Sequence, residues 1–129
     1  MLNVKTELQH LTVEEIKAVA EQRYLPFSVC SLNITGRLNV STIIRSAQAL
    51  GAKEVIVFSR RRFDLRGCVG MQNYIPVKKV SGLSEEGDID CELFNEYILA
   101  NNYTPIFCEV GGHDYRVLTI AGLSIQSWF

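Results

Sequence analysis

The strongest constraint on the fold is the stretch over residues 33–51, NITGRLNVSTIIRSAQALG, which connects two apolar segments. Apolar residues recur in it at helical spacing, which predicts one buried helix face and one polar face. The apolar set is Ile43, Ile44, Ala47 and Leu50, and the polar set is Ser41, Arg45 and Gln48. Asn39 stands where a helix N-cap belongs and Gly51 where a C-terminal glycine belongs, so a helix is predicted over 39–50.

The segments that flank this helix predict parallel strands. Residues 27–34 are apolar on both faces, as in a central strand covered on both sides, and 54–58 are the next apolar run. Short connections in a strand–helix–strand order favour parallel pairing with a right-handed crossover. Further strands are predicted at 75–80 and 104–110, and a helix at 90–102. The predicted fold class is α/β, with a mainly parallel sheet of four or five strands flanked by helices.

The 129 residues suit a single domain with a sizeable core. Thr12 and Glu15 have the spacing of a capping box, so leading helices are expected over 1–24. The strand–helix core is expected over 25–112, and 113–129 is expected to be a divergent tail.

Composition narrows the kind of protein. The sequence has no run of the roughly 18 apolar residues that span a bilayer, and its first residues lack the apolar region of a secretory signal. Its four cysteines are widely spaced without a C-x-x-C motif, and Cys30 and Cys108 fall in predicted strands, where reduced thiols are core residues. Two histidines are too few for a metal cluster. A cytoplasmic protein without membrane spans or a metal site is expected.

Charge is divided unevenly along the chain. Residues 37–79 hold nine basic residues and only two acidic ones, a net charge of +7, while the remainder carries −8. This division favours a basic face suited to phosphate groups. The alternative is an ordinary solvated surface, because charges that cluster in sequence need not cluster in space.

The central helix also resembles the first motif of the SpoU/TrmH-type RNA 2′-O-ribose methyltransferases of the SPOUT superfamily. The motif's asparagine, its arginine six residues later, a small residue, an alanine and a closing glycine correspond to Asn39, Arg45, Ser46, Ala47 and Gly51. The resemblance runs from about residue 11 to residue 112 and includes the strands on both sides and the basic loop at 59–73. It implies S-adenosylmethionine-dependent methylation of tRNA or rRNA by a homodimer.

The resemblance implies roles for particular residues. Arg45 would hold the ribose 2′-hydroxyl and a neighbouring phosphate, and Asn39 would orient Arg45 or the ribose, so these two are the catalytic candidates. Glu109 and Gly111 lie where the family's strand end approaches the cofactor. The candidates for RNA phosphate contact are Arg60, Arg61, Arg62 and Arg66.

The sequence departs from the family after Gly112. It contains neither the Gly-x-Glu motif nor the second asparagine motif that build the family's trefoil knot and cofactor pocket. The expected fold is therefore SPOUT-like without the complete C-terminal knot. A second hypothesis stays open, a non-catalytic RNA-binding or partner-binding half-domain. A generic nucleotide-binding module is disfavoured, because no G-x-G-x-x-G or P-loop lysine motif occurs.

Overall fold

The computed structural model describes residues 5–32, 37–59, 64–81, 89–108, 111–112, 119–120 and 123–124. The chain divides into two compact units, Met1–Glu96 and Tyr97–Phe129. The first unit is an α/β structure, and the second contains the end of one helix and a short antiparallel pair of strands. The single domain expected over 1–129 stays a prediction.

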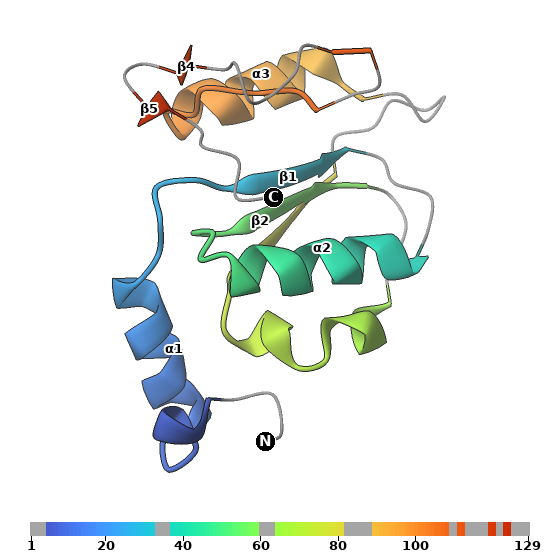
Figure 1. Ribbon diagram of the computed structural model, residues 1–129. Helices are drawn as coiled ribbons and strands as arrows, with labels where there is room; N and C mark the ends of the chain where they lie inside the picture. The colour runs from blue at the N-terminus through green and yellow to red at the C-terminus, as the bar shows by residue number, and fades with distance from the viewer. Residues whose placement is uncertain are drawn as a thin grey trace. The chain divides into compact units, whose positions relative to one another are not determined.

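A parallel three-stranded sheet forms the centre of the first unit (Figure 1). Its strands are β1 (Val29–Leu32), β2 (Val55–Phe58) and β3 (Val77–Val80), in that order. The register places Val29 opposite Val55 and Val55 opposite Val77. The α/β class and three of the predicted strand positions are confirmed, although each strand is shorter than predicted, and the described parallel sheet has three strands and not four or five.

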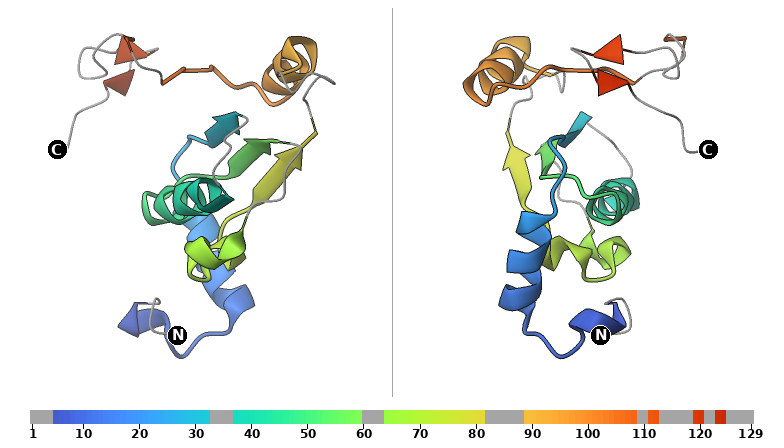
Figure 2. Two further views of the ribbon diagram at one scale, coloured as in Figure 1. Left: turned by 90° about the vertical axis from the view of Figure 1, so that its right-hand side faces the viewer. Right: turned by 60° about the vertical axis from the view of Figure 1, so that its left-hand side comes forward.

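Helices and turns join and cover these strands. The first unit begins with the 3₁₀-helix η1 (Thr6–Leu8) and α1 (Val13–Gln22). Between β1 and β2 runs α2 (Arg37–Ala49), and between β2 and β3 lie two 3₁₀-helices, η2 (Leu65–Cys68) and η3 (Met71–Asn73). Helix α3 (Cys91–Ala100) follows β3, and β4 (Thr119–Ile120) pairs with β5 (Leu123–Ser124). Figure 2 shows that α2, η2 and η3 lie on the same face of the sheet.

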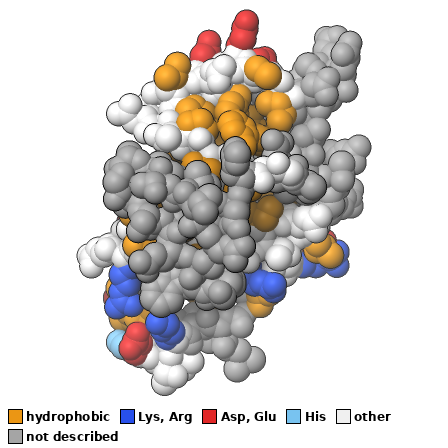
Figure 3. Space-filling view, turned by 45° about the horizontal axis from the view of Figure 1, so that its top comes forward, with side chains coloured by type: hydrophobic (Ala, Val, Ile, Leu, Met, Phe, Trp, Pro, Cys, Tyr) orange, Lys and Arg blue, Asp and Glu red, His pale blue; other side chains and the backbone are white. Residues whose placement is uncertain are grey.

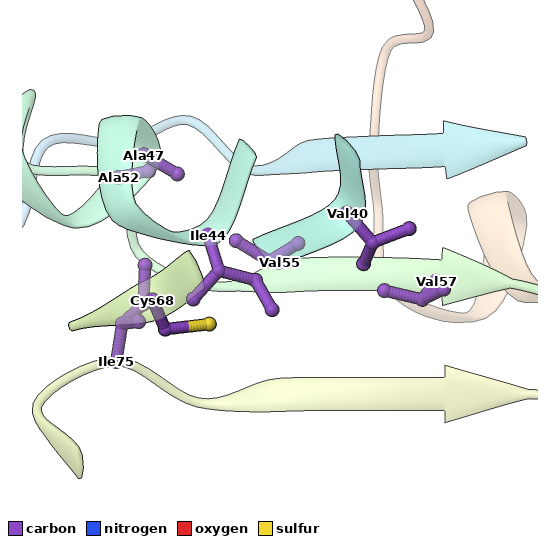
Figure 4. Close-up of a cluster of buried hydrophobic side chains, with 8 residues drawn as sticks. All are labelled: Val40, Ile44, Ala47, Ala52, Val55, Val57, Cys68 and Ile75. Carbon is purple, nitrogen blue, oxygen red and sulfur yellow. The ribbon is translucent and has the colours of Figure 1, made fainter. Parts of the chain in front are cut away.

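The main core lies between α2 and that face of the sheet (Figure 4). Its fully packed members are Val40, Ile44, Ala47, Ala52, Val55, Val57, Cys68 and Ile75. All four residues of β2 are buried, as expected of a central parallel strand. On the other face of the sheet the Phe58 ring meets Phe94 of α3 edge to face, with centroids 5.4 Å apart.

Helix ends follow the local sequence. At α1 the Thr12 hydroxyl accepts from the Glu15 N–H at 3.3 Å and the Glu15 carboxylate accepts from the Thr12 N–H at 2.7 Å, which confirms the capping box. At the end of α2, Gly51 has φ +78°, and its N–H bonds to the Gln48 carbonyl. The Ala52 N–H bonds to the Ala47 carbonyl, so the helix closes in a Schellman motif that requires glycine.

The start of α2 differs from the prediction. The helix begins at Arg37, so Asn39 is its third residue and not its N-cap. The earlier start brings the Leu38 carbonyl into the first turn, where it accepts from the hydroxyls of Ser41 and Thr42 at 2.8 and 3.0 Å. Helix boundaries depend on such contacts as well as on cap residues.

The two predicted faces of α2 also need correction. Ser41 was expected on the polar face, but it is wholly buried, because η2 packs against the helix there. Leu50 was expected on the apolar face, but it lies past the last helical residue and is 68% exposed.

A strand is predicted over 104–110, but residues 104–108 form neither strand nor helix, so the prediction is wrong for these residues. Residues 109–110 lie outside the described residues. An apolar run forms a strand only where a neighbour supplies its hydrogen bonds. Phe107 of this segment is 63% exposed, and Cys108 is exposed as well. Cys30 is also exposed, and the buried thiol is Cys68, contrary to the expectation for Cys30 and Cys108.

Candidate functional site

The carboxyl edge of a parallel sheet is where ligands bind in open α/β folds. Here that edge is formed by Leu32, Phe58 and Val80, the last residues of the three strands. The connections that leave it contain 33–36, 60–63 and 82–88, which lie outside the described residues. Three predicted RNA contacts, Arg60, Arg61 and Arg62, therefore fall outside the described part of this edge.

Both catalytic candidates are carried by α2, and both are exposed. Asn39 is the third residue of the helix and Arg45 is the ninth. Six residues of α-helix correspond to a rise of about 9 Å and a turn of about 120° between the two side chains. The helix therefore presents Asn39 and Arg45 to solvent from different turns and different sides.

The turn η2 packs directly against the flank of α2 that carries Ser41. A Cβ built on Gly67 would lie 2.3 Å from the Ser41 hydroxyl oxygen and 3.2 Å from its Cβ. Only glycine permits so close an approach between these two elements. Ser41 and Arg45 are one helical turn apart, so η2 lies beside the Arg45 position.

Charges from both elements act on the buried Cys68 thiol. Burial raises the pKa of Cys68, the Arg45 guanidinium opposes that rise, and the Asp64 carboxylate adds to it. Helix α2, which carries Arg45, packs directly against η2, whose N-cap is Asp64.

Arg66 is held by Asp64 at this junction. The Arg66 Nε donates to both Asp64 carboxylate oxygens, at 3.0 and 2.8 Å, and its Nη2 donates to Oδ2. The same carboxylate accepts from the Arg66 backbone N–H at 2.9 Å and so caps η2. These bonds raise the pKa of the Arg66 guanidinium, which is 87% exposed. Arg66 is therefore a cation already partnered by a carboxylate, which weakens its attraction for phosphate.

The other acidic residue of the basic segment 37–79 is also paired with a cation. Glu54, just before β2, is buried and forms an ion pair with Lys78 of β3 at 2.7 Å. A buried carboxylate needs such a partner, since an unpaired one would be costly. Both acidic residues of 37–79 thus neutralise a cation, while Arg45, Lys53 and Lys79 are exposed. On the face drawn in Figure 3 the described Lys and Arg side chains lie in separate groups.

The cofactor candidates lie in the second unit. Glu109 is outside the described residues. Gly111 has φ +86°, a conformation that favours glycine, and a Cβ built there would meet no atom of the described residues within 4 Å.

Sequence reasoning missed two residues of this region. Asp64 precedes Arg66 by two positions, and at this spacing an aspartate carboxylate commonly accepts from the backbone N–H two residues later. The sequence alone therefore contains a signal for this cap. Ser31 is buried in β1, and its hydroxyl has no hydrogen-bond partner among the described residues. Its signal was a hydroxyl within an otherwise apolar strand, one residue from the strand's carboxyl end.

The described residues contain no group of histidine, cysteine or acidic side chains placed to hold a metal ion. None of the helices in the described ranges is long and apolar enough to cross a membrane. No protein family, no curated protein and no solved structure matches this chain.

The four thiols should differ in reactivity. Cys91 and Cys108 are exposed and Cys68 is enclosed in the core, while Cys30 is exposed as a residue but has its thiol pKa raised to about 11 by partial burial of the sulfur. Because the thiolate is the reacting form, Cys91 and Cys108 should react with Ellman's reagent at pH 8 about tenfold faster than the other two.

Changing Cys91 and Cys108 to serine should remove the fast phase of this reaction. Guanidinium chloride should make all four thiols of the unmodified chain react alike. A fast phase that disappears with Cys68→Ser would contradict the burial of that thiol.

Proposed function

We propose that this chain is an RNA 2′-O-ribose methyltransferase of the SpoU/TrmH type that acts on tRNA or rRNA. The observation that carries the proposal is Arg45, an exposed arginine on the helix after the first parallel strand, and this helix packs against η2. The core packing of α2 is provided by residues such as Val40 and Ile44, so packing does not account for Arg45. An exposed guanidinium in this position suits phosphate and ribose oxygens, which it binds in a fork.

In this proposal Arg45 positions the substrate. A guanidinium stays protonated near neutral pH, so Arg45 would act by holding a phosphate and the 2′-hydroxyl rather than by removing a proton. Fixing these groups in line for reaction supplies a large share of the rate in such displacements. Asn39 would contact the RNA from the first turn of α2, because about 9 Å of helix separates it from Arg45.

S-adenosylmethionine is the methyl donor that goes with this proposal. The described residues do not form a pocket for it, since Glu109 lies outside them and a Cβ built on Gly111 meets no described atom within 4 Å. We therefore derive no step through the donor. The second candidate function is an RNA-binding or partner-binding half-domain without catalysis, which the absence of the two pocket-building motifs from residues 113–129 favours.

Three further properties accompany the proposal. The fold would be a SPOUT-like core without the complete trefoil knot, because the motifs that build the knot are missing after Gly112. The active form would be a homodimer, since the resembling enzymes assemble their sites between subunits. The chain would act in the cytoplasm, where tRNA and rRNA are available.

Two measurements separate the candidate functions. Calorimetry with S-adenosylmethionine and a tritium methyl-transfer assay on bulk tRNA and rRNA test the enzyme. Electrophoretic mobility shifts with the same RNAs test binding alone. Methyl transfer to ribose supports the first candidate, binding without transfer supports the second, and absence of both would reject the two together.

Asp64→Asn should strengthen RNA binding. Asparagine keeps the cap of η2 but removes the carboxylate that neutralises Arg66. A released guanidinium adds roughly one phosphate contact, so the slope of log K against log salt should steepen by about 0.7–0.9. The measurement is a salt titration of affinity for bulk tRNA.

The matched control is Glu21→Gln on α1, which changes the net charge equally without touching η2. An equal steepening in both variants would show that Arg66 makes no specific contact and that only overall charge matters.

A further inference from the structure

A cavity of about 380 Å³ lies between α1 and the far end of α2. Its lining comes from both N-terminal helices, the last turn of α2 and η3; the lining residues used below are Lys5, Ile16, Val19, Arg23, Ala49 and Met71. A volume of this size is within the range of small-molecule sites. The cavity belongs wholly to the first unit and lies at the opposite end of α2 from Asn39.

The walls of the cavity are mostly apolar and held in place. Ile16 is buried against it, and Val19, Ala49 and Met71 add further apolar lining. The Tyr24 hydroxyl donates to the Tyr74 carbonyl at 2.5 Å, which ties the end of α1 to η3. This hydrogen bond holds the end of α1 at a fixed distance from η3. It also satisfies the tyrosine hydroxyl, so that wall of the cavity has little unsatisfied hydrogen-bonding capacity.

The charged residues of the cavity are both cations. Lys5 and Arg23 line it and are exposed, whereas the carboxylates Glu7, Glu14, Glu15 and Glu21 of the same segment do not line it. Glu21 does act on Tyr24, because burial and then Glu21 raise the pKa of the Tyr24 hydroxyl. The charged part of the cavity lining is therefore suited to a negative group.

We propose that this cavity binds an amphipathic anion, a molecule with an apolar hydrocarbon body and a single carboxylate or phosphate head. The body would lie against Ile16, Val19 and Met71, where burial of apolar surface favours it. The head would lie beside Arg23, which carries the complementary charge, and Lys5 adds a second positive charge to the lining. The site is separate from the surface that Arg45 occupies.

Calorimetry on the full chain tests the proposal with two probes that share a tail and differ in charge. Dodecanoate should bind saturably at one site, and dodecyltrimethylammonium should bind at least about tenfold more weakly, because its head is a cation. Both are used below their micelle-forming concentrations. Equal affinities for the two probes would overturn the proposal, as would no binding of dodecanoate. Dodecyl phosphate in place of dodecanoate distinguishes a phosphate head from a carboxylate.

Variants locate the site. Arg23→Gln should weaken dodecanoate binding about fivefold or more, whereas Lys17→Gln, the same charge change on the same helix but off the lining, should alter it less than twofold. Ala49→Phe should fill the cavity and weaken binding further. Ala49 is exposed, so this change leaves the core of α2 intact. Equal effects of Arg23→Gln and Lys17→Gln would overturn the proposal.

A titration of the unmodified chain, followed by NMR, tests the proposal even if the variants fail to fold. Methyl resonances of Ile16, Val19 and Met71 should shift during a dodecanoate titration of the unmodified chain, because these side chains line the cavity. Shifts confined to the exposed Leu99 and Ile106 of the second unit would show that the probe binds an exposed apolar surface and would reject the cavity as the site.

Discussion

Under the proposed function, replacing Arg45 with alanine should lower methyl transfer to RNA by at least about a hundredfold, the loss typical when one positioned charge is removed from a reacting centre. The side chain is exposed on α2, so the free energy of unfolding should change by less than about 0.5 kcal/mol. Arg45→Lys should restore little, because an ammonium lacks the planar fork of a guanidinium. Single-turnover methyl transfer and urea denaturation measure the two quantities.

Lys53→Ala is the matched control, since it removes an exposed cation of the same basic segment from outside α2. It should reduce RNA affinity slightly and leave the rate of transfer on bound RNA unchanged. If Arg45→Ala unfolds the protein, or if both variants lower the rate equally, then Arg45 is a structural or generally electrostatic residue and the central assignment is wrong.

Gly67→Ala should destabilise the protein by about 1–3 kcal/mol, the usual cost of forcing an extra group into a packed core. The new methyl would lie 2.3 Å from the Ser41 oxygen and 3.2 Å from its Cβ, so either η2 or the serine must move. Moving the serine would break its hydrogen bond to the Leu38 carbonyl inside a fully buried site. Urea denaturation of the purified chain measures the loss.

A double-mutant cycle identifies the cause. Ser41→Ala removes the nearer clash, so the cost of Gly67→Ala should be smaller in that background. Gly70→Ala is the control, because Gly70 has φ +83° and open space around it, and its cost comes from backbone strain alone. Independent effects of Ser41→Ala and Gly67→Ala would contradict the close approach of η2 to α2.

The elements that the sequence predicts correctly are those set by local signals. The apolar runs at β1 and β2, the capping box at Thr12 and the closing glycine at Gly51 each depend on residues a few positions away. The parallel order then follows from a short strand–helix–strand connection.

The errors come from contacts between distant parts of the chain. Ser41 is buried by the η2 backbone at Gly67, a contact that helical periodicity on α2 does not contain. The apolar run at 104–108 has the composition of a strand, but strand formation needs a partner that composition does not supply. For the candidate site, the exposure of Arg45 agrees with its polar helix face, whereas the position of Asn39 inside the helix depends on where α2 begins.

The Schellman closure of α2 has a consequence for the order of folding. The Leu25 N–H bonds to the Gly51 carbonyl and the Lys53 N–H bonds to the Phe27 carbonyl, so the turn after α2 is fastened to the entrance of β1. These two hydrogen bonds and the β1–β2 pairing are all closed within residues 25–58, which keeps the loop entropy of their formation low. Chain segments with local contacts assemble fastest, so this unit would form the nucleus onto which β3 and the 3₁₀-turns dock.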